Sequence, residues 1–232
     1  MLFQRITPVV LSLALFAAGC APPSSEPSLI EQAAFVRSGD TDEIVIQLRP
    51  VTDAELDVLK SLTGLRVLLL DNADNRITDT GMETIATLAN LEHLRIRGGA
   101  IGDAGLEALT ACKHLRILNL PRTQATDCGL AKLERLPKLE QLRVGSPAIT
   151  DLGVKELKGF PALRQVHLID VPLTDVGLTT FSEMPDLESL YVDGALVTDE
   201  GYEALFQARP KLHVHIDQQH HDRDPHAHRH EN

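Results

Sequence analysis

Two hydrophobic patterns alternate along most of the chain, and together they predict a repeating unit. In the first, L-x-x-L-x-L, the last two apolar residues are two positions apart and so point to the same face of an extended strand. In the second, apolar residues recur every three positions, as in Leu106, Leu109 and Cys112, which is typical of a short helix. Each unit is therefore expected to consist of a short strand, a turn and a short helix.

The helical half of each unit opens with the motif I-T-D-x-G-L or a close variant of it. Six copies start at intervals of 24 residues, and an earlier copy starts at Val51, 26 residues before the next one. The regular copies start at Ile77, Ile101, Ala125, Ile149, Leu173 and Val197. One such unit cannot bury its own apolar face, so the units must stack, with their strands parallel and about 4.8 Å apart.

The two ends of the repeat array depart from the regular pattern, as capping units do. Ile44 and Ile46 stand where a preceding strand would lie, so residues 43–48 are predicted to form an N-terminal capping strand. The last repeat changes to strict alternation of Leu212, Val214 and Ile216 after a proline. We therefore expect a domain of residues 43–217, made of a capping strand and seven repeats.

This repeat resembles that of the leucine-rich-repeat family, in particular its bacterial, planctomycete-type members. It is also similar to cysteine-containing leucine-rich repeats, which place a Cys where Cys112 stands. The resemblance covers about residues 43–217. It implies an α/β solenoid that is curved, with a parallel sheet on the concave face and short helices on the convex face, and that binds partners on the sheet.

The Thr-Asp pair at the start of each helical half is predicted to supply oxygen atoms that cap the helix. We interpret the repeated aspartates as such caps and not as acid/base pairs: Asp79, Asp103, Asp127, Asp151, Asp175 and Asp199. No motif of a serine hydrolase, a zinc protease, a phosphate-binding loop or a C-x-x-C pair occurs, so we do not expect an enzyme.

The N-terminus has the features of a secretory signal peptide. Met1–Arg5 carries one positive charge, and the apolar run Ile6–Ala18 would span only about 20 Å as a helix, too short for a bilayer core of about 30 Å. Residues 17–20, Ala-Ala-Gly-Cys, resemble the lipobox of bacterial lipoproteins, which implies a signal peptide of residues 1–19 and a lipid on Cys20. The alternatives are an ordinary cleaved signal and an uncleaved anchor. The lipoprotein interpretation predicts a location in the cell envelope, anchored to the outer membrane or at the periplasmic face.

Residues 20–42 are predicted to be the lipidated cysteine and a flexible linker, because the stretch after Cys20 is rich in Pro and Ser. Within it, Leu29–Val36 could form a turn of helix. The remaining cysteines, Cys112 and Cys128, are interpreted as structural thiols inside the repeats, since three cysteines make no disulfide framework.

Net charge argues against one class of partner. The chain carries a formal charge of −11, whereas nucleic-acid-binding proteins have a basic footprint. Within this acidic protein, the residues that flank the inward apolar positions of each strand would face the concave surface. We expect a ligand-binding face built from Arg95, Arg97, Asn119, Arg122, Arg143, His167, Tyr191 and Asp193, basic in its first half and rich in polar and aromatic groups in its last third. The alternative is a merely solvated sheet.

The C-terminal residues 218–232 are rich in histidine and suggest a second kind of chemistry. His-rich tracts can hold Zn or Ni, and the candidates are His213, His215, His220, His221, His226, His228 and His230. The alternative is a disordered polar tail. The sequence thus predicts a membrane-tethered, non-catalytic module that binds an unknown protein or envelope polymer, with metal sequestration and a passive structural coat as the other hypotheses.

Overall fold

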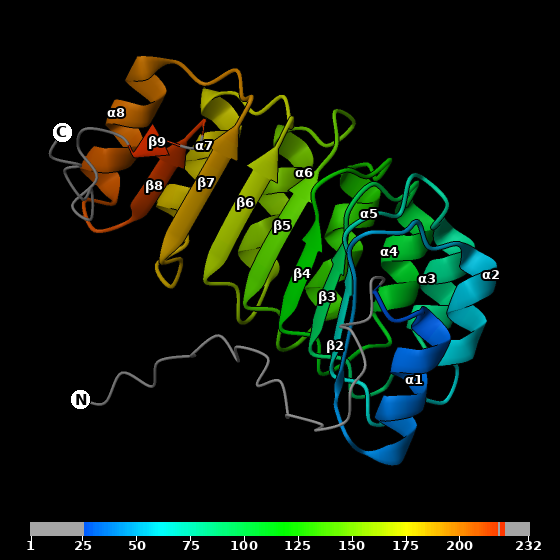
Figure 1. Ribbon diagram of the computed structural model, residues 1–232. Helices are drawn as coiled ribbons and strands as arrows, with labels where there is room; N and C mark the ends of the chain where they lie inside the picture. The colour runs from blue at the N-terminus through cyan, green and yellow to red at the C-terminus, as the bar shows by residue number, and fades with distance from the viewer. Residues whose placement is uncertain (1–25, 218, 221–232) are drawn as a thin grey trace, which may run out of the picture.

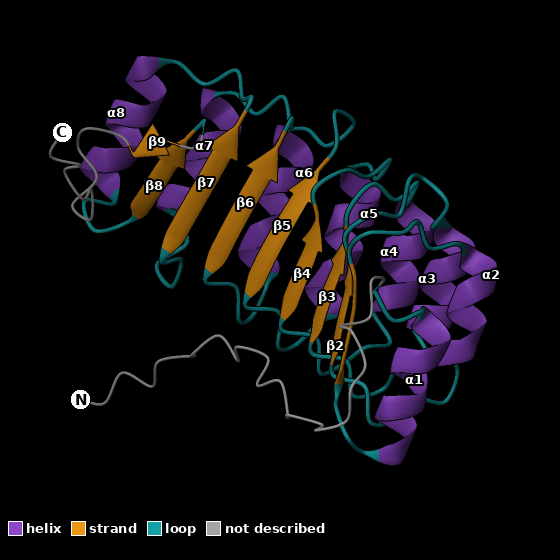
Figure 2. Ribbon diagram, in the orientation of Figure 1, coloured by secondary structure: helices purple, strands orange, loops and turns teal. Residues whose placement is uncertain are grey.

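The chain folds into a curved solenoid with a sheet on its inner face and helices on its outer face (Figures 1 and 2). The computed structural model describes residues 26–217 and 219–220. The nine strands follow one another in chain order, all parallel except the last pair. They are β1 (Glu43–Ile46), β2 (Val67–Leu70), β3 (His93–Ile96), β4 (Ile117–Leu120), β5 (Gln141–Gly145), β6 (Gln165–Ile169), β7 (Ser189–Asp193), β8 (His213–Ile216) and β9 (Gln219–His220). The predicted α/β leucine-rich-repeat architecture, with its capping strand, is confirmed.

The helices between these strands are short, and three of them end in a 3-10 turn. They are α1 (Leu29–Ser38), α2 (Asp53–Leu56), α3 (Asp79–Ile85), α4 (Asp103–Leu109), α5 (Asp127–Lys132), α6 (Asp151–Glu156), α7 (Asp175–Ser182) and α8 (Asp199–Ala208). The 3-10 turns are η1 (Asp57–Leu59), η2 (Leu133–Arg135) and η3 (Leu157–Gly159). From α2 to α8 each helix packs against the next, so that the outer layer repeats in step with the sheet, and α1 packs against η1 and β1.

The register of the sheet equals the period of the sequence. Because neighbouring strands pair at equivalent positions, identical positions of successive repeats form continuous columns through the molecule. The inward column is almost completely shielded from solvent and consists of Leu68, Leu94, Leu118, Leu142, Val166, Leu190 and Val214. This stack of aliphatic side chains supplies the burial that no single repeat could achieve.

The threonine and the aspartate at each helix start form different hydrogen bonds, and those of the aspartate differ from the prediction. The threonine caps its own helix, as Thr126 Oγ1 does by accepting from the N–H of Cys128 at 3.2 Å. The aspartate instead reaches into the next repeat: Asp103 accepts from the N–H of Thr126 and from its hydroxyl, both at 2.7 Å. The interpretation of the aspartates as helix caps was therefore wrong for five of the six repeated positions, which bridge repeats. Asp199, the last repeated aspartate, forms no such bridge with residues 26–217.

The prediction of a flexible linker over residues 20–42 needs correction at its C-terminal end. Residues Leu29–Ser38 form α1, with a capping box at Ser28 and Glu31, so the predicted turn of helix is real and longer than expected. Leu29, Ala33 and Val36 are buried against the first repeat. The hydrophobic positions of this helix belong to the solenoid core, and the folded part therefore begins before residue 43.

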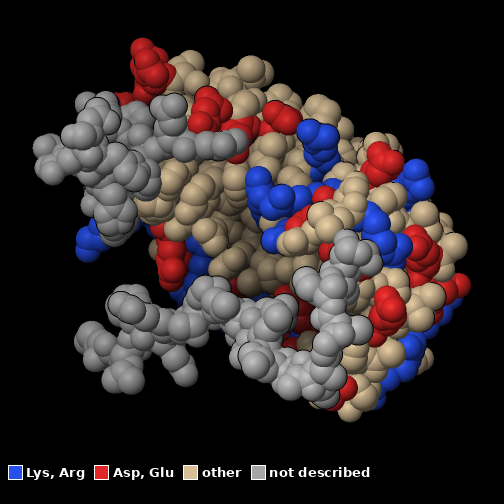
Figure 3. Space-filling model, in the orientation of Figure 1, with Lys and Arg blue, Asp and Glu red and all other residues tan. Residues whose placement is uncertain are grey.

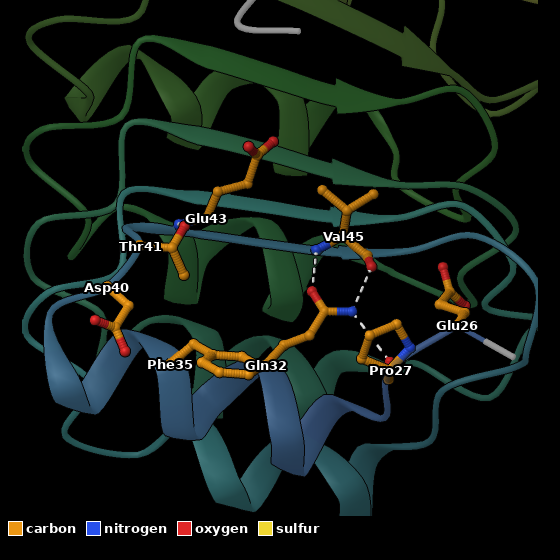
Figure 4. A pocket seen from close by; sticks show the side chains of 8 residues that line it. All are labelled: Glu26, Pro27, Gln32, Phe35, Asp40, Thr41, Glu43 and Val45. Atoms are coloured by element: carbon orange, nitrogen blue, oxygen red, sulfur yellow. Dashed lines mark hydrogen bonds between the residues drawn. The ribbon is translucent and has the colours of Figure 1, made fainter. Parts of the chain in front are cut away.

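Helix α1 also closes the exposed edge of the sheet. The side chain of Gln32 accepts from the N–H of Val45 at 2.8 Å and donates to its carbonyl at 2.7 Å (Figure 4). Glu26 accepts from the N–H groups of Gln47 and Leu48. These bonds occupy backbone groups of the edge strand that would otherwise pair with another chain. We therefore interpret the groove between α1 and β1, about 640 Å³, as part of the cap.

The two cysteines in the repeats have different environments. Cys112 is fully buried, and burial raises the pKa of its thiol to about 11. Cys128 lies within a repeat, as predicted, but is exposed at the start of α5, so it has no structural role in the core.

We expect iodoacetamide to alkylate Cys128 in the native protein and Cys112 only after denaturation, because the thiolate is the reactive form and Cys112 is both shielded and protonated. Mass spectrometry of peptides from native and urea-treated full-length protein measures this. Equal modification of the two in the native state would contradict it.

No helix within residues 26–217 is long and apolar enough to cross a membrane. The predicted signal peptide, Cys20 and its lipid lie outside the residues that the structure describes, as do His221, His226, His228 and His230.

Candidate functional site

The concave face carries the side chains that the sequence singled out. Strand pairing places Leu69, Arg95, Asn119, Arg143, His167, Tyr191 and His215 in one column across the sheet. Lys and Arg side chains gather beside the hollow at the middle of this face (Figure 3). The predicted division into a basic half and an aromatic third is therefore a real arrangement of neighbouring side chains.

The arginines of the basic half divide by their contacts. Arg95 is paired with Asp71 of the preceding strand end: its Nε lies 2.6 Å from Oδ1 and its Nη2 donates to Oδ2 at 2.7 Å. Arg97 approaches the same carboxylate at 3.5 Å. Arg95 and Asp71 are only 20% and 14% exposed, so this pair holds the inner part of the face together. Arg95 is accordingly a poor candidate for direct ligand contact.

Arg143 and Arg122 lie close by and differ from Arg95 and Arg97. Arg143, on β5, is half-buried, and its Nε is shielded from solvent without a hydrogen-bond partner. Burial lowers the pKa of Arg143, and the neighbouring Arg97 and Arg95 act in the same direction against the opposing charge of Asp193. Arg122 lies two residues after the end of β4 and is exposed.

Loops at the C-terminal ends of the strands enclose a pocket of about 560 Å³ around these side chains. Arg97, Arg122 and Arg143 contribute to its lining, together with Asp71 and Asp170. One wall is the loop after β2, which is two residues longer than its equivalents and contributes Asn72, Asp74 and Asn75. Asp74 and Asn75 have φ values of 46° and 55°, the left-handed conformation that short polar side chains tolerate.

A second, smaller pocket of about 160 Å³ lies on the sheet itself and shares Arg143 with the first. Its lining includes Asn119, Gln141, Gln165, His167 and Tyr191. The Oδ1 atom of Asn119 is buried there without a hydrogen-bond partner. This pocket connects the basic half of the face with the aromatic third.

The aromatic third is a stack of rings on consecutive strands. Tyr191 lies between His167 and His215, with ring centroids 5.3 Å and 4.5 Å apart, and the ring planes of Tyr191 and His215 are nearly parallel. His167 Nε2 lies 2.8 Å from a carboxylate oxygen of Asp193. His167 and Tyr191, two of the predicted ligand-binding residues, thus form one stacked surface of rings, with His215 as its outer ring and the carboxylate of Asp193 against His167.

The predicted metal ligands are brought together only in part. His213 and His215 place their Nε2 atoms 2.7 Å apart, as expected for side chains on the same face of a strand. Within residues 26–217, no group of three His, Cys, Asp or Glu side chains is arranged to hold a metal ion. His220 pairs with His215 through the backbone of β9. Asp217, the residue after β8, accepts from the N–H of Gly194.

The histidines of this face predict a pH dependence of stability. Burial lowers the pKa of His167 below its ordinary value of 6.5; the hydrogen bond with Asp193 opposes this, and Arg143 reinforces it. Since the unfolded chain then binds the proton more readily, the free energy of unfolding should fall as pH is lowered through about 6.5 towards the folded-state pKa. His93, whose pKa burial and Arg95 also lower, adds to the same trend.

The slope of unfolding free energy against pH, measured by urea denaturation between about pH 5.5 and 7.5, should be smaller in His167→Gln than in the natural protein. An unchanged slope would show that His167 does not titrate differently in the two states.

Sequence reasoning missed the residues that shape the larger pocket. Asp71, the loop of residues 72–75 and Asp170 were not singled out as site residues. The signal for the loop was present, because the first two motif copies lie 26 residues apart and all later copies 24. A two-residue insertion beside a binding face extends one of its walls.

Comparison with known proteins agrees with the repeat fold. The family model described as "Leucine Rich repeat" matches residues 70–86 and 87–109. An internalin (InlF) from Listeria monocytogenes has a similar structure, with a TM-score of 0.60 and 22% sequence identity over 87% of this chain. The fold is a leucine-rich-repeat solenoid. This chain spans 62% of the length of that internalin, and no curated protein matches its sequence.

Proposed function

We propose that this leucine-rich-repeat protein is a non-catalytic binding module that holds a protein partner on its concave sheet. The observation that carries the proposal is the pair of adjoining pockets on that face, which share Arg143 and contain buried polar atoms without partners. Solenoids of stacked repeats commonly use such extended concave surfaces for binding. Tyr and Arg side chains, which dominate the energetics of many interfaces, are concentrated here.

The proposal includes a location. The lipobox-like residues 17–20 favour a lipid on Cys20 and attachment to the cell envelope, with the solenoid facing an envelope protein or polymer. An envelope location and an acidic chain agree with a protein partner better than with nucleic acid.

A steric block on the sheet tests the binding face. Gln141 and Gln165 project from neighbouring strands into the smaller pocket, and replacing both with Trp would fill the face without removing an ion pair. The matched control replaces Glu83 and Lys155, exposed on the helices α3 and α6 of the convex layer, with Trp.

The full chain is used to capture partners from an envelope extract, and the captured protein is purified and its binding measured by calorimetry. The concave double variant should lose this binding while the convex variant keeps it. Equal binding by both variants would refute the concave face as the interface.

Metal sequestration is a second candidate function, favoured by one observation. His213 and His215 present two Nε2 atoms 2.7 Å apart, so that a small rotation of either ring would let both approach Zn²⁺ or Ni²⁺ at about 2.0–2.1 Å. Further ligands would have to come from His220 and the histidines of residues 221–232.

Calorimetry of the full chain with Zn²⁺ and with Ni²⁺, compared with His213→Gln/His215→Gln, tests this candidate. Loss of saturable binding in the double variant supports it. No binding by the natural protein, or binding that the double variant retains, removes β8 from the site.

A further inference from the structure

Two arginines on the concave face stand apart from the others. In residues 26–217, Arg122 and Arg143 make no hydrogen bond or ion pair with any other group. Every other arginine in these residues contacts a carboxylate or a backbone carbonyl: Arg37, Arg49, Arg66, Arg76, Arg95, Arg97, Arg116, Arg135, Arg164 and Arg209. The two exceptions line the same pocket.

The burial of Arg143 makes the lack of a partner informative. A guanidinium that is half-buried loses hydration, and a buried donor without an acceptor costs free energy. Its Nε is shielded from solvent and unbonded, and the positive charges of Arg97 and Arg95 act against the attraction of the more distant carboxylate of Asp193. An anion in the pocket would offset both costs, and guanidinium groups bind oxyanions with two parallel hydrogen bonds.

The surroundings of the pocket limit the number of negative charges that this anion can carry. The carboxylates of Asp71, Asp74 and Asp170 also line the pocket. Asp71 is paired with Arg95 and Arg97, and Asp74 is paired with Arg76. These groups would repel further negative charges on a ligand. The net charge of −11 acts in the same direction over longer distances. A single anionic group therefore fits better than a polyanion.

A neighbouring acceptor indicates what accompanies the anion. Asn119 pairs with Arg143 across β4 and β5, and its Oδ1 is buried without a donor in the pocket that adjoins the first. A ligand that bonds both residues needs an anionic oxygen and an N–H group a short distance from it. An acidic side chain within a peptide has both.

We propose that Arg122 and Arg143 bind a single carboxylate from an acidic side chain of the protein partner, while Asn119 accepts from a nearby peptide N–H. The inference rests on the proposed binding function and names the chemistry that the partner must present. Arg97, shared with Asp71, adds positive charge to the same pocket.

The probe is N-acetyl-glutamate methylamide, a single carboxylate flanked by two amides, titrated into the full chain at low ionic strength. Binding is followed by the NMR signals of the arginine Nε–H groups. We expect saturable shifts at Arg122 and Arg143 with a dissociation constant on the order of 1 mM. Arg122→Gln and Arg143→Gln should each weaken binding roughly tenfold or more. Since neither side chain has an internal partner, both variants should keep their circular dichroism spectrum.

The matched control is Arg135→Gln, which removes an exposed arginine from the convex layer and should leave binding unchanged. N-acetyl-glutamine methylamide should not bind, because it has no charge. Equal binding of the glutamine compound, or unchanged binding in the arginine variants, would overturn the site. Inorganic phosphate that binds at Arg143 when the glutamate compound does not would overturn the assignment to a carboxylate. None of these outcomes affects the Trp-block experiment on partner capture, so the two proposals fail separately.

Discussion

Asp103→Ala is expected to lower the free energy of unfolding by about 3 kcal/mol, although the side chain is only partly buried. Its carboxylate accepts two hydrogen bonds from Thr126 of the next repeat, and without it the N–H of Thr126 has no acceptor. Hydrogen bonds to charged acceptors are the stronger ones, and they contribute here to an interface between repeats. Urea denaturation of the full chain measures the loss. Asp103→Asn keeps the geometry and should lose about half as much.

The same bridge explains the glycine of the I-T-D-x-G-L motif. A Cβ atom on Gly129 would collide with Oδ1 and Cγ of Asp103, so Gly129→Ala should destabilise the protein mainly through this contact. Combining Gly129→Ala with Asp103→Ala should therefore cost less than the sum of the two single changes. The matched control is Gly153→Ala. The Cβ there would collide with Asp127, the aspartate one repeat before Gly153, so this change should be additive with Asp103→Ala. Additivity in both pairs would contradict the bridge as the reason for the glycine.

Gly145→Ala is expected to cost about 3 kcal/mol, because the obstacle there is backbone that cannot move independently. The new Cβ would lie 2.9 Å from the carbonyl oxygen of Ile169 and closer still to that of Pro121, on the two adjacent chain segments. Gly145 also accepts at its carbonyl from the N–H and hydroxyl of Thr123. A shift of this segment displaces Arg122, so affinity for N-acetyl-glutamate methylamide should fall together with stability.

Gly64→Ala is the matched control, because the nearest atoms to its Cβ are 3.5 Å away, an ordinary contact. It should change the unfolding midpoint little and leave the binding of the glutamate compound unaltered. If Gly145→Ala is as stable as Gly64→Ala, the backbone around the pocket is more adaptable than its close packing suggests.

The concave face thus contains two kinds of charged residue with different roles. Arg95 and Asp71 neutralise each other and hold adjacent strand ends together, whereas Arg122 and Arg143 form no ion pair with residues 26–217 and can bind an anionic ligand. A charge-reversal experiment at Arg95 would place a second carboxylate beside Asp71 and disturb the sheet. Functional tests should therefore begin with Arg122 and Arg143, whose replacement removes no internal bond.

How far the sequence predicts this molecule depends on the range of the interaction. The 24-residue period and the spacing of Leu118 and Leu120 are sufficient to predict the strand, the stacking and the column that contains Arg95, Asn119 and Arg143. Helix α1 was underestimated because its three buried residues have meaning only beside the first repeat. The aspartates were misassigned because their partners lie 23 residues or more away.

The amino-acid pattern alone was enough to predict the solenoid and the residues that share its concave face. Both follow from the local hydrophobic periodicity, because stacked identical units place equivalent positions side by side. Only the folded molecule shows whether a charged side chain on that face already has an internal partner or can bind a ligand. Arg95 and Arg143 occupy equivalent positions two repeats apart, yet one has Asp71 beside it and the other has no counter-ion in contact. That difference arises from the neighbours that the fold brings to each side chain across the sheet, and a local sequence pattern does not specify these neighbours.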